Sequence, residues 1–209
     1  MKPDYSLYLV TDRHLAGGRA LSEIVMESVA GGVSCVQLRE KKLGTREFVQ
    51  EAKRIHDLLL VAGVPLIIND RIDVAQACNA EGVHLGQSDM HIKDARKILG
   101  PDIIIGISAE SLQDAVDAEK DGADYIGISP VFSTKTKEDI ATPLGLEGVA
   151  EIRKNVDIPL VGIGGINDKN CADVVRYGAD GIAVVSAIIA AEDVMAATSR
   201  LRRKIEPFL

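Results

Sequence analysis

The sequence alternates between short apolar runs and longer segments with helical periodicity, and this alternation constrains the fold more than any other feature. The apolar runs with the length of a β-strand are residues 7–11, 35–39, 66–69, 83–86, 103–108, 125–129, 160–164 and 181–186. Between the second and third runs, Phe48, Ala52 and Ile55 recur at the spacing of an amphipathic helix. A strand followed by a helix and then another strand is the repeating unit of a parallel β-sheet.

Glycine recurs where a predicted helix passes into the next strand. Gly63, Gly122 and Gly178 each stand shortly before an apolar run. Glycine readily adopts the left-handed backbone conformation that ends a helix, so the connections can be short. No Ser/Gly-rich linker or low-complexity segment divides the chain. We therefore expect one catalytic domain that spans residues 1–209.

Eight strand–helix units can close into a barrel or lie in an open, doubly wound sheet. Polar residues follow nearly every predicted strand, as Asp12, Asn69, Gln87, Ser108 and Ser186 do. All the strand ends meet in one ring in a barrel, whereas an open sheet brings together only those at its switch point. The sequence therefore predicts an α/β protein with a single-domain (β/α)8 TIM barrel and an active site at this ring.

Charge and composition argue against several kinds of partner. The net charge of the 209 residues is −7, which opposes general binding to nucleic acid or to an anionic membrane. The longest apolar run, residues 182–191, is too short to span a bilayer. The cysteines form no zinc motif, and the N-terminus does not resemble a signal peptide. We expect a cytoplasmic protein, and the sequence leaves open whether it forms a homo-oligomer.

Two carboxylates follow neighbouring strands. Asp70 comes directly after the run 66–69, and Asp89 comes shortly after the run 83–86. Neighbouring parallel strands would place these side chains next to each other, where their oxygens suit Mg²⁺. Aspartate is also a favoured residue at the N-terminus of a helix, and each aspartate taken singly fits this capping interpretation better.

Basic side chains follow the second predicted strand. With the two-residue alternation of a strand, Gln37, Arg39 and Lys41 would point to one side, into the mouth of the barrel. An arginine and a lysine at this place suit a di- or triphosphate. A surface cluster of basic groups paired with Glu40 and Glu47 is an alternative of equal weight.

A second anion pocket is suggested by the last strands and by the longest loop. Residues 129–137 alternate hydroxyl side chains with lysines, which can close over phosphate oxygens, although a solvated loop has the same composition. Gly164 and Gly165 follow the seventh strand, and Ser186 ends the eighth, where barrels often bind phosphate. His84 fits a packed strand residue better than a base. Two anion pockets beside two carboxylates indicate an enzyme that joins a diphosphate substrate to a monophosphate substrate.

Six short motifs run in order from the second predicted strand to the eighth. They are Gln37-Leu38-Arg39-Glu40-Lys41, Asn69-Asp70-Arg71, His84-Leu85-Gly86-Gln87-x-Asp89, Gly127-x-x-Pro130-x-x-x-Thr134-x-Thr136-Lys137, Ile163-Gly164-Gly165-Ile166 and Val185-Ser186. Together these motifs resemble the thiamine-phosphate synthase (thiamine-phosphate pyrophosphorylase) family. One position departs from the family pattern, because Ser88 stands where an acidic residue is frequent.

The resemblance implies a TIM-barrel transferase of thiamine biosynthesis. Its small-molecule substrates would be 4-amino-2-methyl-5-pyrimidinylmethyl diphosphate and 4-methyl-5-(2-phosphoethyl)thiazole, and its products thiamine monophosphate and pyrophosphate. The displacement would be dissociative and assisted by Mg²⁺. Pyrophosphate would leave the methylene carbon before the thiazole nitrogen attacks it.

The resemblance also implies a role for particular residues. Those expected to hold the pyrimidine diphosphate are Gln37, Leu38, Arg39, Glu40, Lys41, Asn69, Ser108 and Lys137. Those expected to hold the thiazole phosphate are Thr134, Lys135, Thr136, Gly165, Val185 and Ser186. The expected Mg²⁺ ligands are Asp70 and Asp89. The alternatives are a related thiazole tautomerase, which would lack the metal and pyrophosphate groups, and a non-catalytic barrel that regulates through a partner.

Overall fold

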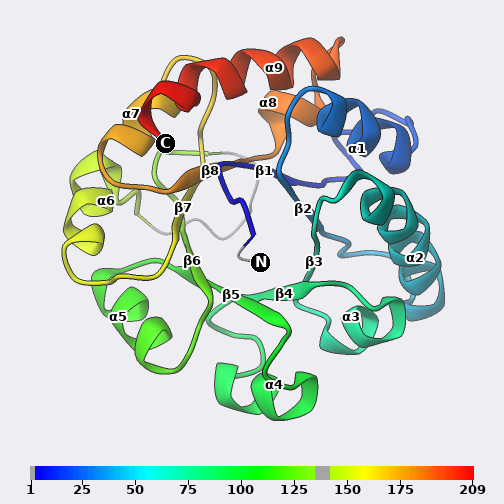
Figure 1. The fold of residues 1–209 in the computed structure, drawn as a ribbon, viewed down its shortest axis with the longest axis horizontal. Coiled ribbons are helices and arrows are strands. Elements are labelled where there is room, and N and C mark those ends of the chain that lie inside the picture. The colour runs from blue at the N-terminus through cyan, green and yellow to red at the C-terminus, as the bar shows by residue number, and fades with distance from the viewer. Residues whose placement is uncertain (1–2, 135–141) are drawn as a thin grey trace.

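A computed structural model of the chain describes residues 3–134 and 142–209. Its strands form a closed parallel barrel in which each strand pairs with the next and the last pairs with the first (Figure 1). The strands are β1 (Leu7–Val10), β2 (Cys35–Leu38), β3 (Leu66–Asn69), β4 (Gly82–Leu85), β5 (Ile104–Ala109), β6 (Tyr125–Ile128), β7 (Leu160–Ile163) and β8 (Gly181–Val184). The predicted TIM barrel is confirmed.

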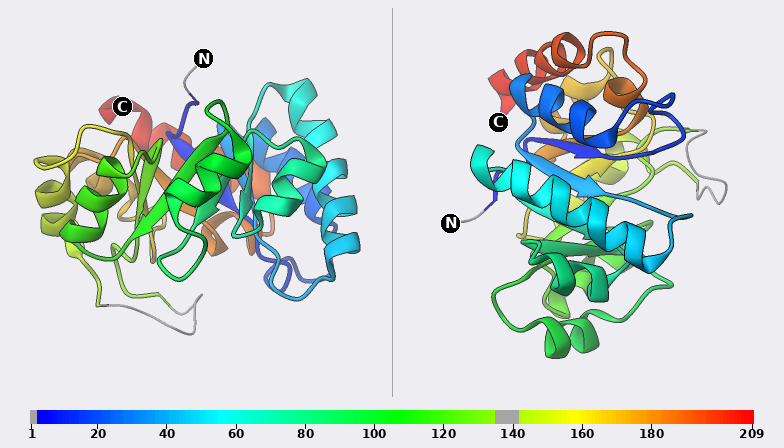
Figure 2. Two further views of the ribbon diagram at one scale, coloured as in Figure 1. Left: turned by 90° about the horizontal axis from the view of Figure 1, so that it is seen from below. Right: turned by 90° about the vertical axis from the view of Figure 1, so that its right-hand side faces the viewer.

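Helices surround the barrel and lie outside its strands (Figures 1 and 2). They are α1 (Leu21–Ala30), α2 (Thr45–Ala62), α3 (Ile72–Cys78), α4 (Ile92–Leu99), α5 (Leu112–Lys120), α6 (Gly145–Arg153), α7 (Cys171–Arg176), α8 (Ser186–Ile189) and α9 (Val194–Ile205), followed by the 3₁₀ helix η1 (Glu206–Phe208). The last long helix, α9, packs against α1 and α7 and so completes the outer ring. The apolar stripe predicted on α2 is confirmed, because Phe48, Ala52 and Ile55 are buried.

The strands begin close to the predicted positions, but several of them end earlier. The run 35–39 was expected to be one strand, whereas β2 ends at Leu38. The strand ends there because the backbone N–H of Arg39 donates to the side-chain hydroxyl of Thr11 at 2.9 Å instead of to a backbone carbonyl. Strand alternation therefore places Gln37 inside the barrel, but it does not extend to Arg39 and Lys41. Both residues lie beyond the end of β2, yet Arg39 still lines the cavity at the mouth of the barrel, as alternation predicts, and Lys41 contacts Asp70.

Two layers of apolar side chains form the core. The larger layer fills the space between the barrel and the helices. The smaller layer lies inside the barrel and includes three tyrosines, Tyr5, Tyr8 and Tyr125. The rings of Tyr5 and Tyr125 stack with their centroids 4.5 Å apart. These aromatic side chains fill the interior of the barrel below the ring formed by the C-terminal ends of the strands.

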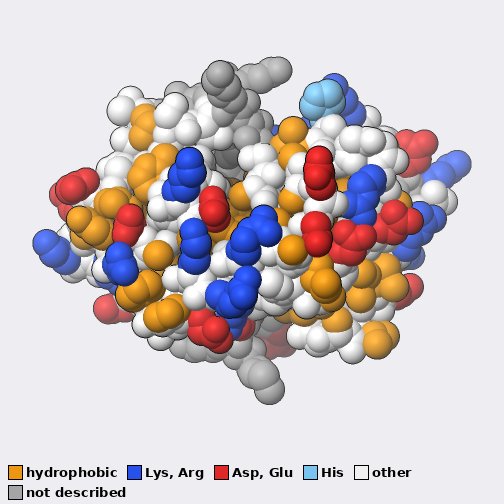
Figure 3. All heavy atoms as spheres, turned by 90° about the horizontal axis from the view of Figure 1, so that it is seen from above, with side chains coloured by type: hydrophobic (Ala, Val, Ile, Leu, Met, Phe, Trp, Pro, Cys, Tyr) orange, Lys and Arg blue, Asp and Glu red, His pale blue; other side chains and the backbone are white. Residues whose placement is uncertain are grey.

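The outer surface mixes the two signs of charge. Figure 3 shows a face on which basic, acidic and hydrophobic side chains alternate. On α9, Arg202 lies 3.7 Å from the carboxylate of Asp4, and Lys204 lies 3.4 Å from that of Asp168. Among the described residues, no helix has the length and apolar character needed to cross a membrane.

Gly106 provides the space that the ring of Tyr125 occupies. A Cβ atom at Gly106 would lie 2.1 Å from the Tyr125 ring, far inside van der Waals contact. We expect Gly106→Ala to lower the free energy of unfolding by about 1–3 kcal/mol, because a buried ring would have to move. Urea denaturation measures this. Gly44→Ala is the comparison, since a Cβ there meets no atom within 4 Å. Because Gly44 is the N-terminal cap of α2, where alanine is the poorer residue, this substitution should cost about 0.5 kcal/mol, less than the clash at Gly106.

Candidate active site

A cavity of about 640 Å³ lies at the C-terminal ends of the strands. Its lining comes from both halves of the barrel, so residues far apart in sequence face one space. The predicted substrate-binding residues that line it are Gln37, Arg39, Asn69, Ser108, Thr134, Gly165, Val185 and Ser186. The structure therefore brings both groups of predicted residues together, although their binding roles stay predictions.

Other predicted substrate residues lie elsewhere. The side chain of Leu38 is buried in the core between the barrel and the helices. The carboxylate of Glu40 accepts a hydrogen bond of 2.8 Å from the guanidinium of Arg13. The ammonium of Lys41 donates to the carboxylate of Asp70. Residues Lys135, Thr136 and Lys137 lie outside the described residues.

The side chains of Asp70 and Asp89 do not cap helices. Helix α3 begins after Arg71 and helix α4 after His91, which are the residues at their N-terminal caps. The Asp89 carboxylate instead accepts the backbone N–H of Gly86 at 2.7 Å. The capping interpretation is therefore wrong for both aspartates, and both carboxylates stand at the mouth of the barrel.

The backbone of Asp70 is held in an uncommon conformation. Its φ angle is +61°, in the left-handed region that side-chain-bearing residues rarely adopt. The backbone N–H of Asp70 donates to the carbonyl of His84 at 2.9 Å, which ties the turn to the neighbouring strand β4. Such strain is found where the surrounding structure fixes a residue for function.

The two carboxyl groups influence each other. Burial raises the pKa of Asp89, the N–H of Gly86 lowers it, and the neighbouring Asp70 raises it again, so the net shift is upward. Burial also raises the pKa of Asp70, but hydrogen bonds from Lys41 and Asp89 lower it, and the net shift is downward. The opposite shifts in pKa mean that, as the pH falls, Asp89 takes up a proton before Asp70 does. A divalent cation at this place would relieve their repulsion.

The acidic pair fits Mg²⁺ better than it fits a metal held by protein ligands alone. Within the described residues, no group of three or more His, Cys, Asp or Glu side chains could hold a metal ion. Mg²⁺ is commonly bound through one or two carboxylates, with substrate phosphates and waters completing its octahedron. Asp70 and Asp89 therefore suit an ion that binds together with a diphosphate.

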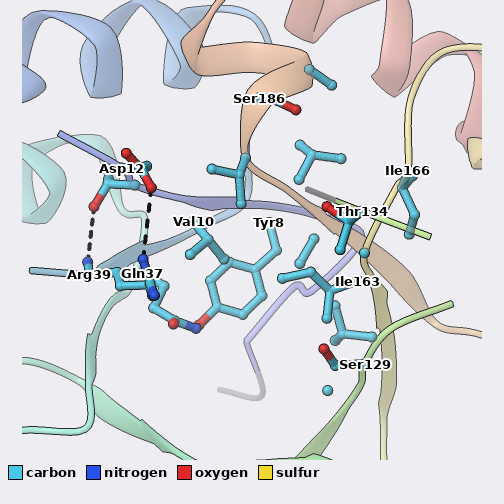
Figure 4. Close-up of a pocket in the computed structure, with 18 of the residues that line it drawn as sticks. Tyr8, Val10, Asp12, Gln37, Arg39, Ser129, Thr134, Ile163, Ile166 and Ser186 are labelled. Carbon is cyan, nitrogen blue, oxygen red and sulfur yellow. Dashed lines mark hydrogen bonds and ion pairs between the residues drawn. The ribbon is translucent and has the colours of Figure 1, made fainter. Parts of the chain in front are cut away.

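Asp12 orients Arg39 at the edge of the cavity. One oxygen of Asp12 accepts the backbone N–H groups of His14 at 2.9 Å and Leu15 at 3.1 Å. Its other oxygen lies 3.8 Å from the guanidinium of Arg39, and the two side chains lie beside each other in Figure 4. The sequence placed Asp12 in the polar ring but gave it no role, since its partner could not be identified without the fold.

Asn69 carries a buried donor with no acceptor. Its side-chain nitrogen makes no hydrogen bond within the described part of the chain, and only 8% of the residue is exposed. Leaving such a buried donor unpaired costs about 1–3 kcal/mol. Because Asn69 also lines the cavity, a ligand acceptor would remove this cost.

Glycines open the opposite side of the cavity to an anion. Gly164 and Gly165 have positive φ angles of 102° and 65°. A Cβ at Gly165 would lie 2.6 Å from the carbonyl oxygen of Ser133, so only glycine fits between these segments. Ser186 begins α8 directly after Val185, which places the first amides of this helix beside the cavity. Backbone amides at such a place can hold a phosphate.

The floor of the cavity contains polar groups to which the sequence analysis gave no role. Tyr8, His84 and Tyr125 line it, and hydrogen bonds join their side chains. The prediction of His84 as a packed strand residue is correct for its place in β4 but misses its contact with the cavity. The two-residue alternation in β1, with Tyr8 and Val10 facing inward, is the signal that could have located this floor.

Anion-binding groups around the mouth of a (β/α)8 barrel are typical of enzymes that act on phosphorylated small molecules. Within that class, the family model "thiamine monophosphate synthase" matches residues 7–188, and the chain belongs to this family. The chain is accordingly an enzyme, a transferase, and the resemblance found in its motifs is confirmed.

Individual relatives agree with the family assignment. Thiamine-phosphate synthase from Albidiferax ferrireducens is 53% identical over 96% of this chain and 91% of its own length. The one from Chloroflexus aurantiacus is 52% identical over 95% and 92%. The solved thiamine phosphate pyrophosphorylase from Pyrococcus furiosus is 43% identical, with a TM-score of 0.92 over 100% of this chain and 98% of that one. A 3-hexulose-6-phosphate synthase from Salmonella typhimurium (17% identity, TM-score 0.72, 98% and 100% covered) shares the fold alone.

The strain at Asp70 can be measured by comparing two substitutions. Asp70→Gly and Asp70→Ala both remove the carboxylate, but only glycine adopts the left-handed backbone easily. We expect Asp70→Gly to be more stable than Asp70→Ala by about 1 kcal/mol in urea denaturation. The same pair at Asp73, in the first turn of α3, is the control. There the order should reverse, because glycine is the poorer residue in a helix. An equal order at both positions would contradict strain at Asp70.

Proposed function

We propose that the enzyme joins 4-amino-2-methyl-5-pyrimidinylmethyl diphosphate to 4-methyl-5-(2-phosphoethyl)thiazole, forming thiamine monophosphate and pyrophosphate. Membership of the family supports this reaction. The observation that carries it beyond family membership is the placement of Lys41 beside the carboxylates of Asp70 and Asp89, with Arg39 held by Asp12 at the edge of the same cavity mouth. A diphosphate with its Mg²⁺ has the charges that this group complements.

In this proposal the diphosphate lies at the cationic side of the mouth. Arg39 binds phosphate oxygens through its planar guanidinium, and Asp12 keeps that group in place. Lys41, which already contacts Asp70, adds a second positive charge where the pyrophosphate leaves. Asp70 and Asp89 hold Mg²⁺, and the chemistry that the ion supplies when bound is neutralisation of the leaving pyrophosphate.

The aminopyrimidine lies deeper, against the ends of β2, β3 and β5. Gln37, Asn69 and Ser108 offer polar groups there, and the unpaired amide nitrogen of Asn69 finds an acceptor on the substrate. The mechanism requires no nucleophilic side chain. Burial raises the pKa of the Cys35 thiol far above its ordinary value, so this residue stays protonated. Catalysis then consists of positioning and of stabilising the charge that develops as pyrophosphate departs.

The thiazole phosphate occupies the side of the cavity near β7 and β8. Gly165 lets the phosphate approach the backbone, and Ser186 with the amide end of α8 donates to it. Thr134 lines the same cavity and adds a hydroxyl. The thiazole nitrogen is thereby held facing the methylene carbon of the pyrimidine. Cytoplasmic location and homo-oligomer formation stay predictions from the sequence.

The decisive experiment is incubation of the purified protein with both substrates and Mg²⁺, followed by oxidation of the product to fluorescent thiochrome. We expect thiamine monophosphate to accumulate, and chelation of Mg²⁺ to stop it. A folded protein that forms no product would contradict the proposal. If the protein were a thiazole tautomerase, it would instead interconvert thiazole tautomers without Mg²⁺ or the pyrimidine. A non-catalytic barrel would bind a thiamine precursor but convert neither the pyrimidine nor the thiazole substrate.

Mg²⁺ binding should depend on pH in a direction fixed by the carboxyl pair. Because the pKa of Asp89 is raised, protons compete with Mg²⁺ for this carboxylate up to a higher pH than they would at an ordinary aspartate. In the presence of pyrophosphate, we therefore expect affinity to rise with pH until Asp89 is ionised, and calorimetry in two buffers to record proton release. Asp89→Asn should weaken Mg²⁺ binding at least about tenfold and abolish this proton release.

The matched control for this measurement is Asp94→Asn. Asp94 lies in α4 and pairs with Lys97 at 2.8 Å on the exposed surface. Its loss removes the same charge from the protein without touching the cavity, so Mg²⁺ affinity and proton release should not change. Equal effects of the two substitutions would show that net charge, and not a ligand, is responsible.

A further inference from the structure

We propose that Tyr8 and Tyr125 are positioning residues that fix which hydrogen-bonding groups Gln37 and Ser108 present to the pyrimidine, and so set specificity for an amino-substituted ring. This inference rests on the proposed function, because it assigns a role to the floor of the same cavity. Neither tyrosine is among the substrate-binding residues that the sequence predicts.

A continuous chain of hydrogen bonds crosses the floor of the barrel. The side-chain nitrogen of Gln37 donates to the hydroxyl of Tyr8 at 3.2 Å, and this hydroxyl lies 2.9 Å from that of Tyr125. The Tyr125 hydroxyl lies 2.8 Å from Nδ1 of His84, whose Nε2 lies 2.9 Å from the hydroxyl of Ser108. This series of hydrogen bonds thus joins side chains from β2, β1, β6, β4 and β5. Figure 4 shows Gln37 reaching toward Tyr8 at one end of it.

The orientation of the Gln37 amide, whose nitrogen faces Tyr8, gives this series of hydrogen bonds one direction. The Tyr8 hydroxyl accepts a hydrogen bond from Gln37. It has one proton of its own, with which it donates a hydrogen bond to Tyr125. Tyr125 in turn donates a hydrogen bond to Nδ1 of His84. A neutral imidazole that accepts at Nδ1 carries its proton on Nε2, so His84 donates to Ser108.

The reverse direction is unfavourable. With the Gln37 nitrogen facing Tyr8, a bond from Tyr125 to Tyr8 would leave the proton of the Tyr8 hydroxyl, within the described residues, with only the sulfur of Cys35 nearby, which is a weak acceptor. Tyr8 is only 1% exposed, so water cannot take the proton instead. Burial also raises the pKa of both Tyr8 and Tyr125 well above the ordinary value, so both keep the proton that the chain requires.

The direction determines what the cavity offers to a ligand. At one end, the side-chain nitrogen of Gln37 donates to Tyr8, which leaves the side-chain carbonyl oxygen of Gln37 to accept a hydrogen bond from a ligand. At the other end, the Ser108 hydroxyl accepts from His84, which leaves its own proton to donate. A 4-aminopyrimidine has the matching groups, an exocyclic amine that donates and a ring nitrogen that accepts. A 4-hydroxypyrimidine in its oxo form has the opposite pattern, with an accepting oxygen and a donating N–H.

Packing keeps the two tyrosines in place. Tyr125 is fully buried, with Gly106 against its ring and the ring of Tyr5 stacked on it at 4.5 Å. The hydroxyl groups therefore cannot turn to other partners without moving the core. Because the tyrosines are fixed, the orientation of the Gln37 amide on one side of the cavity determines whether Ser108 donates or accepts on the other.

Two substitutions, Tyr125→Phe and Tyr8→Phe, remove one hydroxyl each and retain the ring. Tyr5→Phe is the matched control, because Tyr5 lies in the same buried cluster but its hydroxyl is not part of the chain. The first measurement is the ratio of kcat/KM for the natural pyrimidine diphosphate to that for its 4-hydroxy analogue. We expect this ratio to fall about tenfold in Tyr125→Phe and in Tyr8→Phe, and to stay unchanged in Tyr5→Phe. A purely structural role would lower both values of kcat/KM together and leave their ratio constant.

The second measurement is independent of activity. The ¹⁵N chemical shifts of His84 distinguish the ring nitrogen that carries the proton, and we expect Nε2–H in the wild-type protein and a change in Tyr125→Phe. A proton on Nδ1 in the wild-type protein, or an unchanged specificity ratio in both tyrosine variants, would overturn the inference. If the wild-type protein formed no thiamine monophosphate, the proposed function would fail, while the His84 spectrum would still decide the direction of the chain.

Discussion

Pairing between β8 and β1 is the contact on which the site depends. Leu7 pairs with Ile182, and Leu9 with Val184, although the partners are far apart in the sequence. Because this pairing closes the sheet, residues that follow the second strand and residues that follow the eighth face one cavity. An open sheet made from the same strands would have left Arg39 and Ser186 on distant edges. Closure therefore converts eight unrelated strand ends into one binding surface.

Within that surface, opposite charges are kept close but are not all neutralised by one another. Lys41 contacts Asp70 and lies near Asp89, and Arg39 stands 3.8 Å from Asp12, so each cation lies beside at least one carboxylate. Asp89 has a raised pKa because burial and Asp70 both oppose its charge. This arrangement of charges suits the Mg²⁺ and the diphosphate of the proposed reaction. Family membership and this arrangement point to the same pair of ligands from independent directions.

The sequence predicted the barrel and most of the residues around its mouth, because both depend on periodicity. Polar residues such as Asn69 and Ser108 follow apolar runs, and parallel strands bring such positions together. The sequence could not predict where β2 ends, because this depends on a hydrogen bond from Arg39 to Thr11, a residue of another strand-end. The capping interpretation of Asp70 failed for a similar reason, since its backbone is set by a bond to His84. The floor was missed because side chains inside a barrel meet only after closure.

The three tyrosines inside the barrel determine from which side a molecule can enter the cavity. They fill the barrel below the cavity, so a molecule that reaches Gln37 must have passed the residues at the mouth first. A second molecule bound at Gly165 or Ser186 stands nearer to that entrance. In the proposed reaction the pyrimidine therefore lies deeper in the cavity than the thiazole phosphate. Because the barrel has one open end here, both products of the proposed reaction, the joined molecule and the pyrophosphate, leave through the opening by which the substrates entered.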